Sequence, residues 1–139
     1  MATTEVFADT NLFLRYLTND VPKQAAAVQR LIEQARDGEV ILRVTPLVIA
    51  EIVWTLSSFY KLSKTSIQYL VLVVLNSPGV VVDDAPIVAE ATMLFANLNI
   101  DFIDAYHICW MPTAGLGTVY TFDVKHFRRD NRINVVQPL

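Results

Sequence analysis

The chain contains few of the residues that build specialised scaffolds. Its 139 residues include one cysteine, four glycines, six prolines and two histidines. The single cysteine, Cys109, excludes an internal disulfide and any metal site made from a cysteine cluster. The longest apolar run, residues 69–75, is far shorter than the roughly 18 residues that cross a bilayer. The N-terminus has neither a basic region nor an apolar one, so we expect no secretory signal.

Charge is also scarce, and slightly negative. Charged residues make up 18% of the sequence, and 11 Lys and Arg against 14 Asp and Glu give a net charge of −3. A protein that holds nucleic acid by bulk attraction is usually basic. Hydrophobic residues make up 53%, which excludes a disordered chain and indicates apolar surface for a partner or a second copy. We predict one cytoplasmic domain over residues 1–139, with no membrane and no organic cofactor.

Strand and helix patterns alternate along the chain. Short apolar runs at 5–8, 40–44, 80–82, 117–122 and 133–136 predict strands. Apolar residues at helical spacing fill the segments between them, and helix starts are marked at Pro22 and at Thr45-Pro46. The helix over 47–59 is apolar nearly all round, so we expect it to be central and buried. The alternation predicts an α/β sandwich with a short, mostly parallel sheet.

Two aspartates follow predicted strands directly. Asp9 comes after the first strand, and Asp123 comes after the strand at 117–122. In parallel sheets the ligand site lies beyond the carboxyl ends of the strands, so both carboxylates are expected in one crevice. The alternative for each is a helix cap or a turn former.

Glu51 interrupts an apolar face. Its neighbours at helical spacing are Leu47, Val48, Trp54 and Thr55. Glutamate is almost never fully buried unless it is paired, and an isolated buried carboxylate is costly. The same helix offers no Lys or Arg, so we interpret Glu51 as functional. The alternative is that it reaches the edge of the helix or pairs from elsewhere.

Asp101 and Asp104 share one face of the helix that they open. Asp101 is equally suited to capping that helix, whereas Asp104 favours a functional role. If Asp9, Glu51, Asp104 and Asp123 converge, each close pair repels by roughly 4 kcal/mol at about 4 Å and an effective dielectric of 20. A divalent cation relieves this repulsion, and oxygen ligands favour Mg²⁺ or Mn²⁺. Such an ion activates water and neutralises phosphoryl charge, so an acidic protein can act on RNA.

Four segments together carry a family resemblance. They are Asp9-Thr10-Asn11, Ala50-Glu51, Asp101-Phe102-Ile103-Asp104-Ala105 and Thr121-Phe122-Asp123-Val124-Lys125-His126-Phe127. In order and spacing they resemble the motifs of PIN-domain nucleases, and most closely those of the VapC-type toxins of bacterial toxin–antitoxin pairs. The resemblance implies a three-layer α/β/α sandwich and a Mg²⁺- or Mn²⁺-dependent endoribonuclease. It also implies a homodimer that a VapB-like antitoxin inhibits.

The resemblance also assigns roles by position. Asp9, Glu51, Asp104 and Asp123 match the family's acidic, metal-binding quartet. Asn11 and Thr121 match the polar positions that support it, and Asp101 matches a less constant, accessory acid.

Basic residues follow the last motif acid. Lys125, Arg128, Arg129 and Arg132 are spaced to share one helical face, and with Arg15 they are candidate contacts for RNA phosphates. The alternative is a solvated surface without a partner.

The two histidines do not support a catalytic triad. His107 and His126 are far apart in sequence and lack a nucleophilic serine, so structural roles are favoured. Cys109 is expected in the core. Trp54, Trp110, Phe95 and Tyr106 are expected in the core or at an interface rather than as base-stacking platforms.

Two other function classes remain as hypotheses. A non-catalytic interaction module of the same fold would use the acids as caps and the apolar surplus for partner binding. An aspartyl-phosphate protein is disfavoured, because Asp9-Thr10-Asn11 lacks a second aspartate and Asp83-Asp84 lies in the wrong half of the chain.

Overall fold

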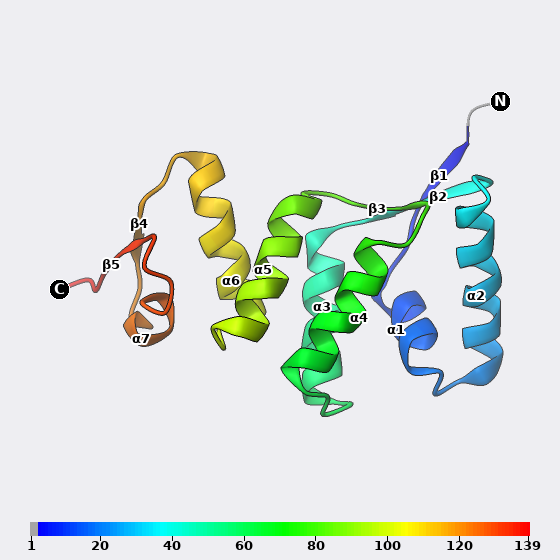
Figure 1. Ribbon diagram of the computed structural model, residues 1–139, viewed down its shortest axis with the longest axis horizontal. Coiled ribbons are helices and arrows are strands. Elements are labelled where there is room, and N and C mark those ends of the chain that lie inside the picture. Colours follow the sequence, from blue (N-terminus) through cyan, green and yellow to red (C-terminus); the bar gives the residue numbers. More distant parts are fainter. Residues whose placement is uncertain (1–2) are drawn as a thin grey trace. The chain divides into compact units, whose positions relative to one another are not determined.

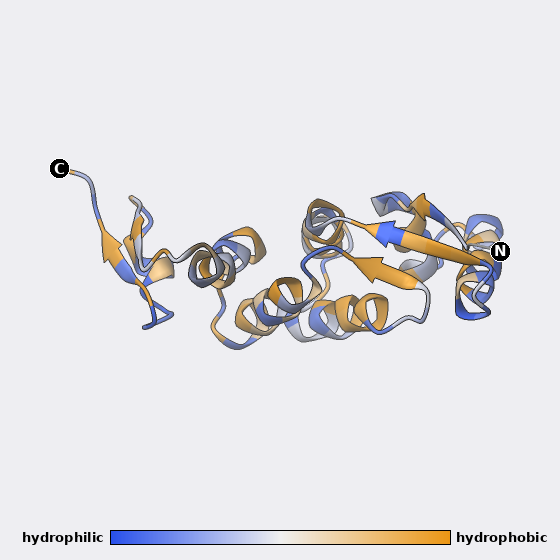
Figure 2. Cartoon of the chain, turned by 90° about the horizontal axis from the view of Figure 1, so that it is seen from above, coloured by the Kyte–Doolittle hydropathy of each residue, from blue (hydrophilic) through white to orange (hydrophobic). Residues whose placement is uncertain are grey.

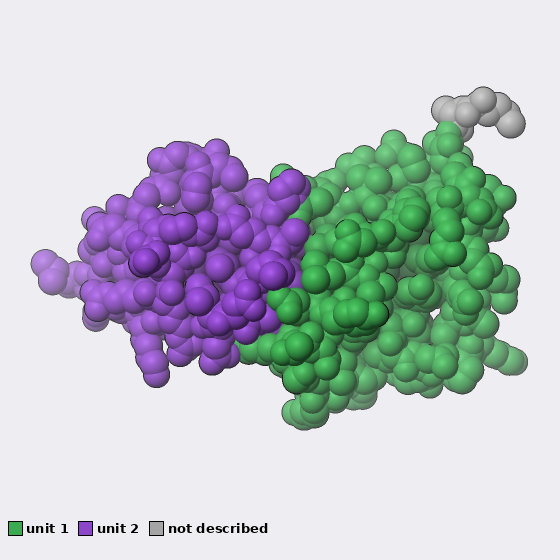
Figure 3. Space-filling view, in the orientation of Figure 1, with its two compact units in different colours: residues 1–85 green, residues 86–139 purple. Residues whose placement is uncertain are grey.

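The computed structural model describes residues 3–139. The chain divides into two compact units, residues 1–85 (unit 1) and 86–139 (unit 2), which Figure 3 shows in two colours. Each unit contains its own parallel strand pairing and its own buried side chains.

Unit 1 alternates single strands with pairs of helices (Figure 1). Its elements are β1 (Thr4–Phe7), α1 (Thr10–Thr18), α2 (Pro22–Arg36), β2 (Val40–Val44), α3 (Pro46–Ser58), α4 (Lys64–Leu75) and β3 (Val80–Val82). The sheet order is β1-β2-β3, and both pairings are parallel. Thr4 lies opposite Val40, and Leu42 lies opposite Val80. The strand at 40–44 and the strand at 80–82 were both predicted with these bounds.

One face of this sheet forms the core of unit 1. Arg43 and Val81 are exposed, and the strand residues on either side of each are buried: Leu42, Val44, Val80 and Val82. This alternation is the two-residue period of a strand with one covered face. Helices α2 and α4 contact the sheet, α1 packs on α2 and α3, and α3 packs on α4. Figure 2 shows the strands of unit 1 largely in the hydrophobic colour, whereas α2 carries both colours.

Three helices in unit 1 begin at polar caps. Asp9, Thr45 and Ser63 each accept a hydrogen bond from the backbone N–H three residues later. These bonds satisfy one of the otherwise free N–H groups of a helix start. Pro46 then occupies the first turn of α3, where its missing N–H has no cost.

Unit 2 contains helices followed by a small two-stranded sheet. Its elements are α5 (Ala85–Asn97), which begins at the last residue of unit 1, α6 (Phe102–Trp110), a 3₁₀ turn η1 (Met111–Ala114), β4 (Thr118–Tyr120), α7 (Val124–Phe127) and β5 (Asn134–Val136). Strands β4 and β5 are parallel, with Thr118 opposite Asn134. The rings of Phe95 and Phe102 pack edge to face, with centroids 6.5 Å apart.

The α/β class and the parallel strands are confirmed. The prediction of a wholly buried third helix is wrong. Leu47 and Trp54 of α3 are 76% and 69% exposed, because α1 and α4 pack against the other face of the helix, where Ile49, Ile52 and Leu56 are buried. No helix among residues 3–139 combines the length and apolar character needed to cross a membrane.

The prediction of a basic helical stripe after Asp123 is also wrong. Helix α7 ends at Phe127, so Arg128, Arg129 and Arg132 lie outside it. Phe127 is buried and anchors the short helix, and the chain then turns toward β5.

Candidate functional site

Asp9 and Glu51 are the candidate carboxylates of unit 1. Asp9 lies between β1 and α1, where its Oδ1 accepts from the Leu12 N–H at 3.3 Å. Glu51 lies in the middle of α3, which packs against α1. Asn11 is exposed in the first turn of α1. The cap and the functional role are compatible for Asp9, because its second oxygen, Oδ2, is not used by the capping bond.

The expected burial of Glu51 is wrong. Its side chain is exposed, on the same face of α3 as Leu47 and Trp54. Glu51 therefore interrupts an apolar surface rather than the core, and it needs no buried partner. Its predicted role in metal binding stays a prediction.

Asp104 and Asp123 both lie in unit 2, within electrostatic range of each other. Asp104 lies half-buried in the first turn of α6. Burial is the main cause that raises the pKa of the Asp104 carboxyl above its ordinary value, and the negative charges of Asp101 and Asp123 add to it. His107 and His126 act in the opposite direction. The two predicted site acids therefore lie within electrostatic range of each other.

Asp123 is held by two neighbours. It follows β4 and caps α7 through an N–H bond from His126 at 3.4 Å. The Nδ1 atom of His126 lies 2.7 and 2.9 Å from the two oxygens of Asp123. These bonds hold the pKa of the Asp123 carboxyl below its ordinary value. The Thr121 hydroxyl accepts the Asp123 N–H at 2.9 Å, so Thr121 supports the backbone that presents the carboxylate.

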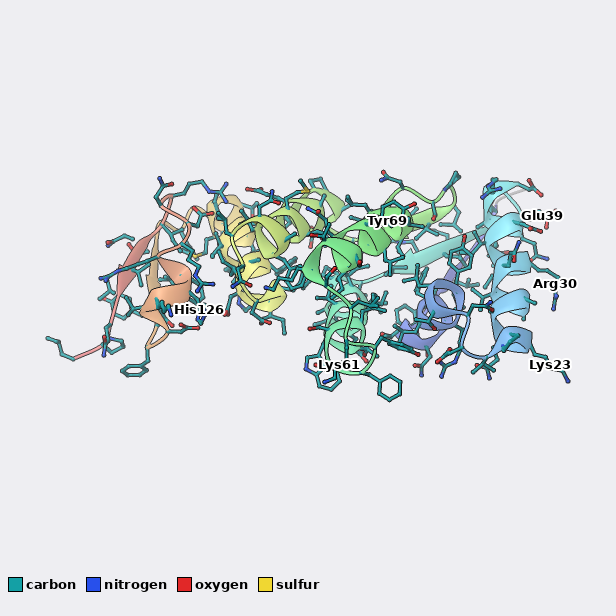
Figure 4. All side chains as sticks on the ribbon, turned by 60° about the horizontal axis from the view of Figure 1, so that its bottom comes forward. Lys23, Arg30, Glu39, Lys61, Tyr69 and His126 are labelled. Carbon is teal, nitrogen blue, oxygen red and sulfur yellow. The ribbon has the colours of Figure 1, made fainter. Side chains whose placement is uncertain are left out.

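Sequence reasoning missed the contact between His126 and Asp123. The sequence predicts a structural role for His126 but not its contact with Asp123. The signal was available: an aspartate at a helix start and a histidine three residues later share one face of the first turn. Figure 4 labels His126 beside α7.

Asp101 occupies the N-cap position of α6 without using its side chain as a cap. Its backbone carbonyl accepts from the Ala105 N–H at 2.8 Å, and its carboxylate makes no capping hydrogen bond. The carboxylate is exposed and close enough to Asp104 to raise its pKa. This leaves Asp101 available as an accessory acid.

The candidate RNA-binding cations differ in whether they already bond to other groups of the protein. Arg15 bonds to Gln24 at 2.9 Å and to Asp20 at 3.2 Å. Arg129 donates to the carbonyl of Asn99. Lys125 and Arg128 are exposed, on and directly after α7, within a few residues of Asp123. Of the predicted set, these two are the best placed for a phosphate.

The donor set in unit 2 suits a hard divalent cation. Asp104 and Asp123 offer carboxylate oxygens, and the pKa of Asp104 is raised first by burial and then by the charges of Asp101 and Asp123. Oxygen donors of this kind favour Mg²⁺ or Mn²⁺. Within residues 3–139, however, no three His, Cys, Asp or Glu side chains are close enough together to hold a metal ion. Asp104 and Asp123 alone do not make a metal site, and their role in metal binding stays a prediction.

The PIN domain family profile matches residues 6–131. The chain belongs to the PIN domain family. The match spans all four predicted acids and both compact units. PIN domains are generally nucleases, commonly metal-dependent ribonucleases, and the short parallel sheet is consistent with their three-layer α/β/α sandwich. A search of the curated proteins finds no match to this PIN domain.

Proposed function

We propose that this PIN domain is a Mg²⁺- or Mn²⁺-dependent endoribonuclease that hydrolyses phosphodiester bonds in RNA. The observation that carries the proposal is that Asp123 lies near enough to Asp104 to raise its pKa, in a chain of a nuclease family. A helix acid and a strand-end acid that approach each other are suited to sharing a cation.

Asp104 and Asp123 would hold the cation, and we propose that Asp9 and Glu51 complete its ligands. The ion, when bound, supplies Lewis-acid chemistry that acidifies water and neutralises charge on phosphoryl oxygens. His126 fixes the orientation of the Asp123 carboxylate through Nδ1, and Thr121 fixes its backbone. The ammonium group of Lys125 and the guanidinium of Arg128, both exposed near Asp123, would contact the RNA phosphates.

We further propose that the protein is a cytoplasmic toxin of a toxin–antitoxin pair. In this proposal it forms a homodimer and is inhibited by a VapB-like antitoxin. Support comes from the resemblance of the four motifs and from large apolar side chains on the surface of unit 1. These are Leu47, Trp54, Phe59 and Tyr69.

The same apolar side chains favour a second candidate, a catalytically silent interaction module. In that case Asp9 and Asp123 act as helix caps, which is a role that both of them have in the structure. Metal binding distinguishes the two candidates, because a cap does not need a cation.

The test is cleavage of total cellular RNA by antitoxin-free protein with Mg²⁺, with Mn²⁺ and with chelator. We expect discrete fragments that require metal and that disappear in Asp104→Asn. The matched control is Asp37→Asn, an exposed aspartate at the end of α2 in unit 1. Absence of both cleavage and Mn²⁺ binding in folded protein would overturn the nuclease and favour the interaction module.

A further inference from the structure

A cluster of charges follows Asp123 in unit 2. The Asp130 carboxylate is only 5% exposed, although it is charged. Arg132 encloses it with four bonds. Its backbone N–H and Nε reach Oδ1 at 2.9 and 3.0 Å, Nε also reaches Oδ2 at 3.1 Å, and Nη2 reaches Oδ2 at 2.7 Å. These bonds, rather than solvent, compensate the buried charge, and they hold the pKa of Asp130 below its ordinary value.

The same guanidinium also contacts α5. Its Nη1 donates to Oε1 of Glu90 on α5 at 2.5 Å. Helix α5 in turn packs on α6, where the rings of Phe95 and Phe102 meet edge to face. The Arg132 side chain therefore ties the turn that precedes β5 to α5, and through α5 to α6.

This cluster matters because the elements around it carry the two candidate site acids of unit 2. Helix α6 bears Asp104, and the segment from β4 through α7 to β5 bears Asp123. Helix α7 has only four residues, and its buried anchor is Phe127. A helix this short is not stable by itself, so its position depends on tertiary contacts. Phe127 provides one such contact, and the bonds of Arg132 stabilise the chain just beyond the helix.

The hollow around the cluster does not have the chemistry of a ligand pocket. Glu90, Leu94, Leu98, Arg129 and Asp130 contribute to its lining, with Arg132. Asp130 and Glu90 are both bonded to Arg132, and Arg129 donates to the Asn99 carbonyl. The charged groups of this hollow are therefore bonded to one another or to the backbone.

We propose that Arg132 is a positioning residue for the nuclease reaction: it fixes the segment that follows Asp123 to α5, and α5 packs on the helix that carries Asp104. The inference rests on the proposed function. It assigns the spacing of the two carboxylates to the bonds from Arg132 to Glu90 and Asp130, beyond the residues that would touch the cation or the RNA.

The test compares Arg132→Lys and Glu90→Gln with the control Arg30→Gln. Arg30 projects from α2 in unit 1, away from that unit's other helices (Figure 4). Lysine keeps the charge but cannot form the fork that joins both acids. We expect kcat to fall roughly 10- to 100-fold in Arg132→Lys, because a small misplacement of a catalytic group lowers the rate by about that factor. The fall should be smaller in Glu90→Gln. In both variants KM for RNA should stay within about twofold of the wild-type value.

Two further measurements separate positioning from simple loss of folding. Glu90→Gln leaves the buried Asp130–Arg132 pair intact, so it should fold even if changes at Arg132 do not. Amide hydrogen exchange over 124–128 should become faster in both variants, whereas exchange in α6 should stay at the wild-type rate. Mn²⁺ binding should weaken in the same order as kcat.

The outcomes are distinct. If wild type cleaves RNA and both variants keep its kcat, the positioning role is wrong and the nuclease stands. If exchange over 124–128 stays unchanged in both variants, Arg132 does not hold this segment in place, whatever the activity. If wild type neither cleaves RNA nor binds Mn²⁺, the proposed function fails and the positioning role fails with it.

Discussion

The Asp104 carboxyl occupies a candidate functional position, and its surroundings disfavour its ionised form. Burial, Asp101 and Asp123 all raise its pKa, so the folded state disfavours its ionised form. At neutral pH the carboxyl is ionised in the unfolded chain, and folding brings that charge toward other negative charges. A residue that serves chemistry rather than stability has this character.

Asp104→Asn is expected to stabilise the protein at pH 7 while it abolishes cleavage. Because the folded-state pKa is raised, the ionised group destabilises the fold above that pKa, and the amide removes this effect. We expect a gain of less than about 1 kcal/mol in the free energy of unfolding, since solvent screens a half-buried group. Denaturant unfolding at pH 7 and pH 3 measures it. The gain should vanish at pH 3, where both states are protonated, and an equal gain at both pH values would contradict this cause.

At the scale of single elements, the residue at which a helix starts can be predicted from sequence more directly than which faces of that helix are buried. Asp9, Thr45 and Ser63 are local signals, and the structure uses each as a cap. The exposure of Glu51 and Trp54 depends on how much of α3 its neighbours cover, which periodicity alone does not state. The Asp104–Asp123 approach is similar, because it depends on the path of the chain from α6 to β4. Convergence of all four acids stays a prediction.

The turn into β3 depends on a glycine for two reasons. Gly79 has φ +82°, and a Cβ there would lie 2.3 Å from the carbonyl oxygen of Ala35 at the end of α2. That contact is with backbone, which cannot move without shifting α2.

Gly79→Ala is therefore expected to destabilise unit 1 by well over about 1 kcal/mol. Gly38→Ala is the matched control, with φ +80° and no atom within 4 Å of its added Cβ. It should cost only the backbone strain, about 1 kcal/mol. Thermal unfolding of the two variants measures the difference. Equal losses would show that the contact with Ala35 is relieved without cost.

At the scale of the whole molecule, acid should weaken the fold through its paired carboxyls. The pKa of Asp130 is lowered, chiefly by Arg132. A carboxyl with a lowered folded-state pKa stabilises the protein above its unfolded pKa of about 3.9, and this contribution is lost as the pH falls through the folded value. The free energy of unfolding should therefore decline below about pH 4. Asp130→Asn should show a shallower decline over the same range, and an unchanged slope would exclude Asp130 as a contributor.

Divalent cations should stabilise the folded protein if the proposed function is correct. A ligand that binds only the folded state at 100 times its Kd adds about 2.7 kcal/mol to the free energy of unfolding. We expect Mn²⁺ to raise the Tm of wild type and of Asp37→Asn but not that of Asp104→Asn. A thermal melt with and without chelator measures this effect. An equal rise in all three proteins would indicate binding elsewhere.

The parallel ladder of unit 1 also sets an order of events during synthesis. Thr4 pairs with Val40, so its partner is made 36 residues later. At about 5–20 residues per second, a ribosome needs about 2–7 s to make that stretch. During this interval β1 has no strand to pair with, while α1 and α2, whose contacts are local, can already form. Strand β1 is therefore made before its partner β2 and cannot pair with it until residue 40 and those after it have been made.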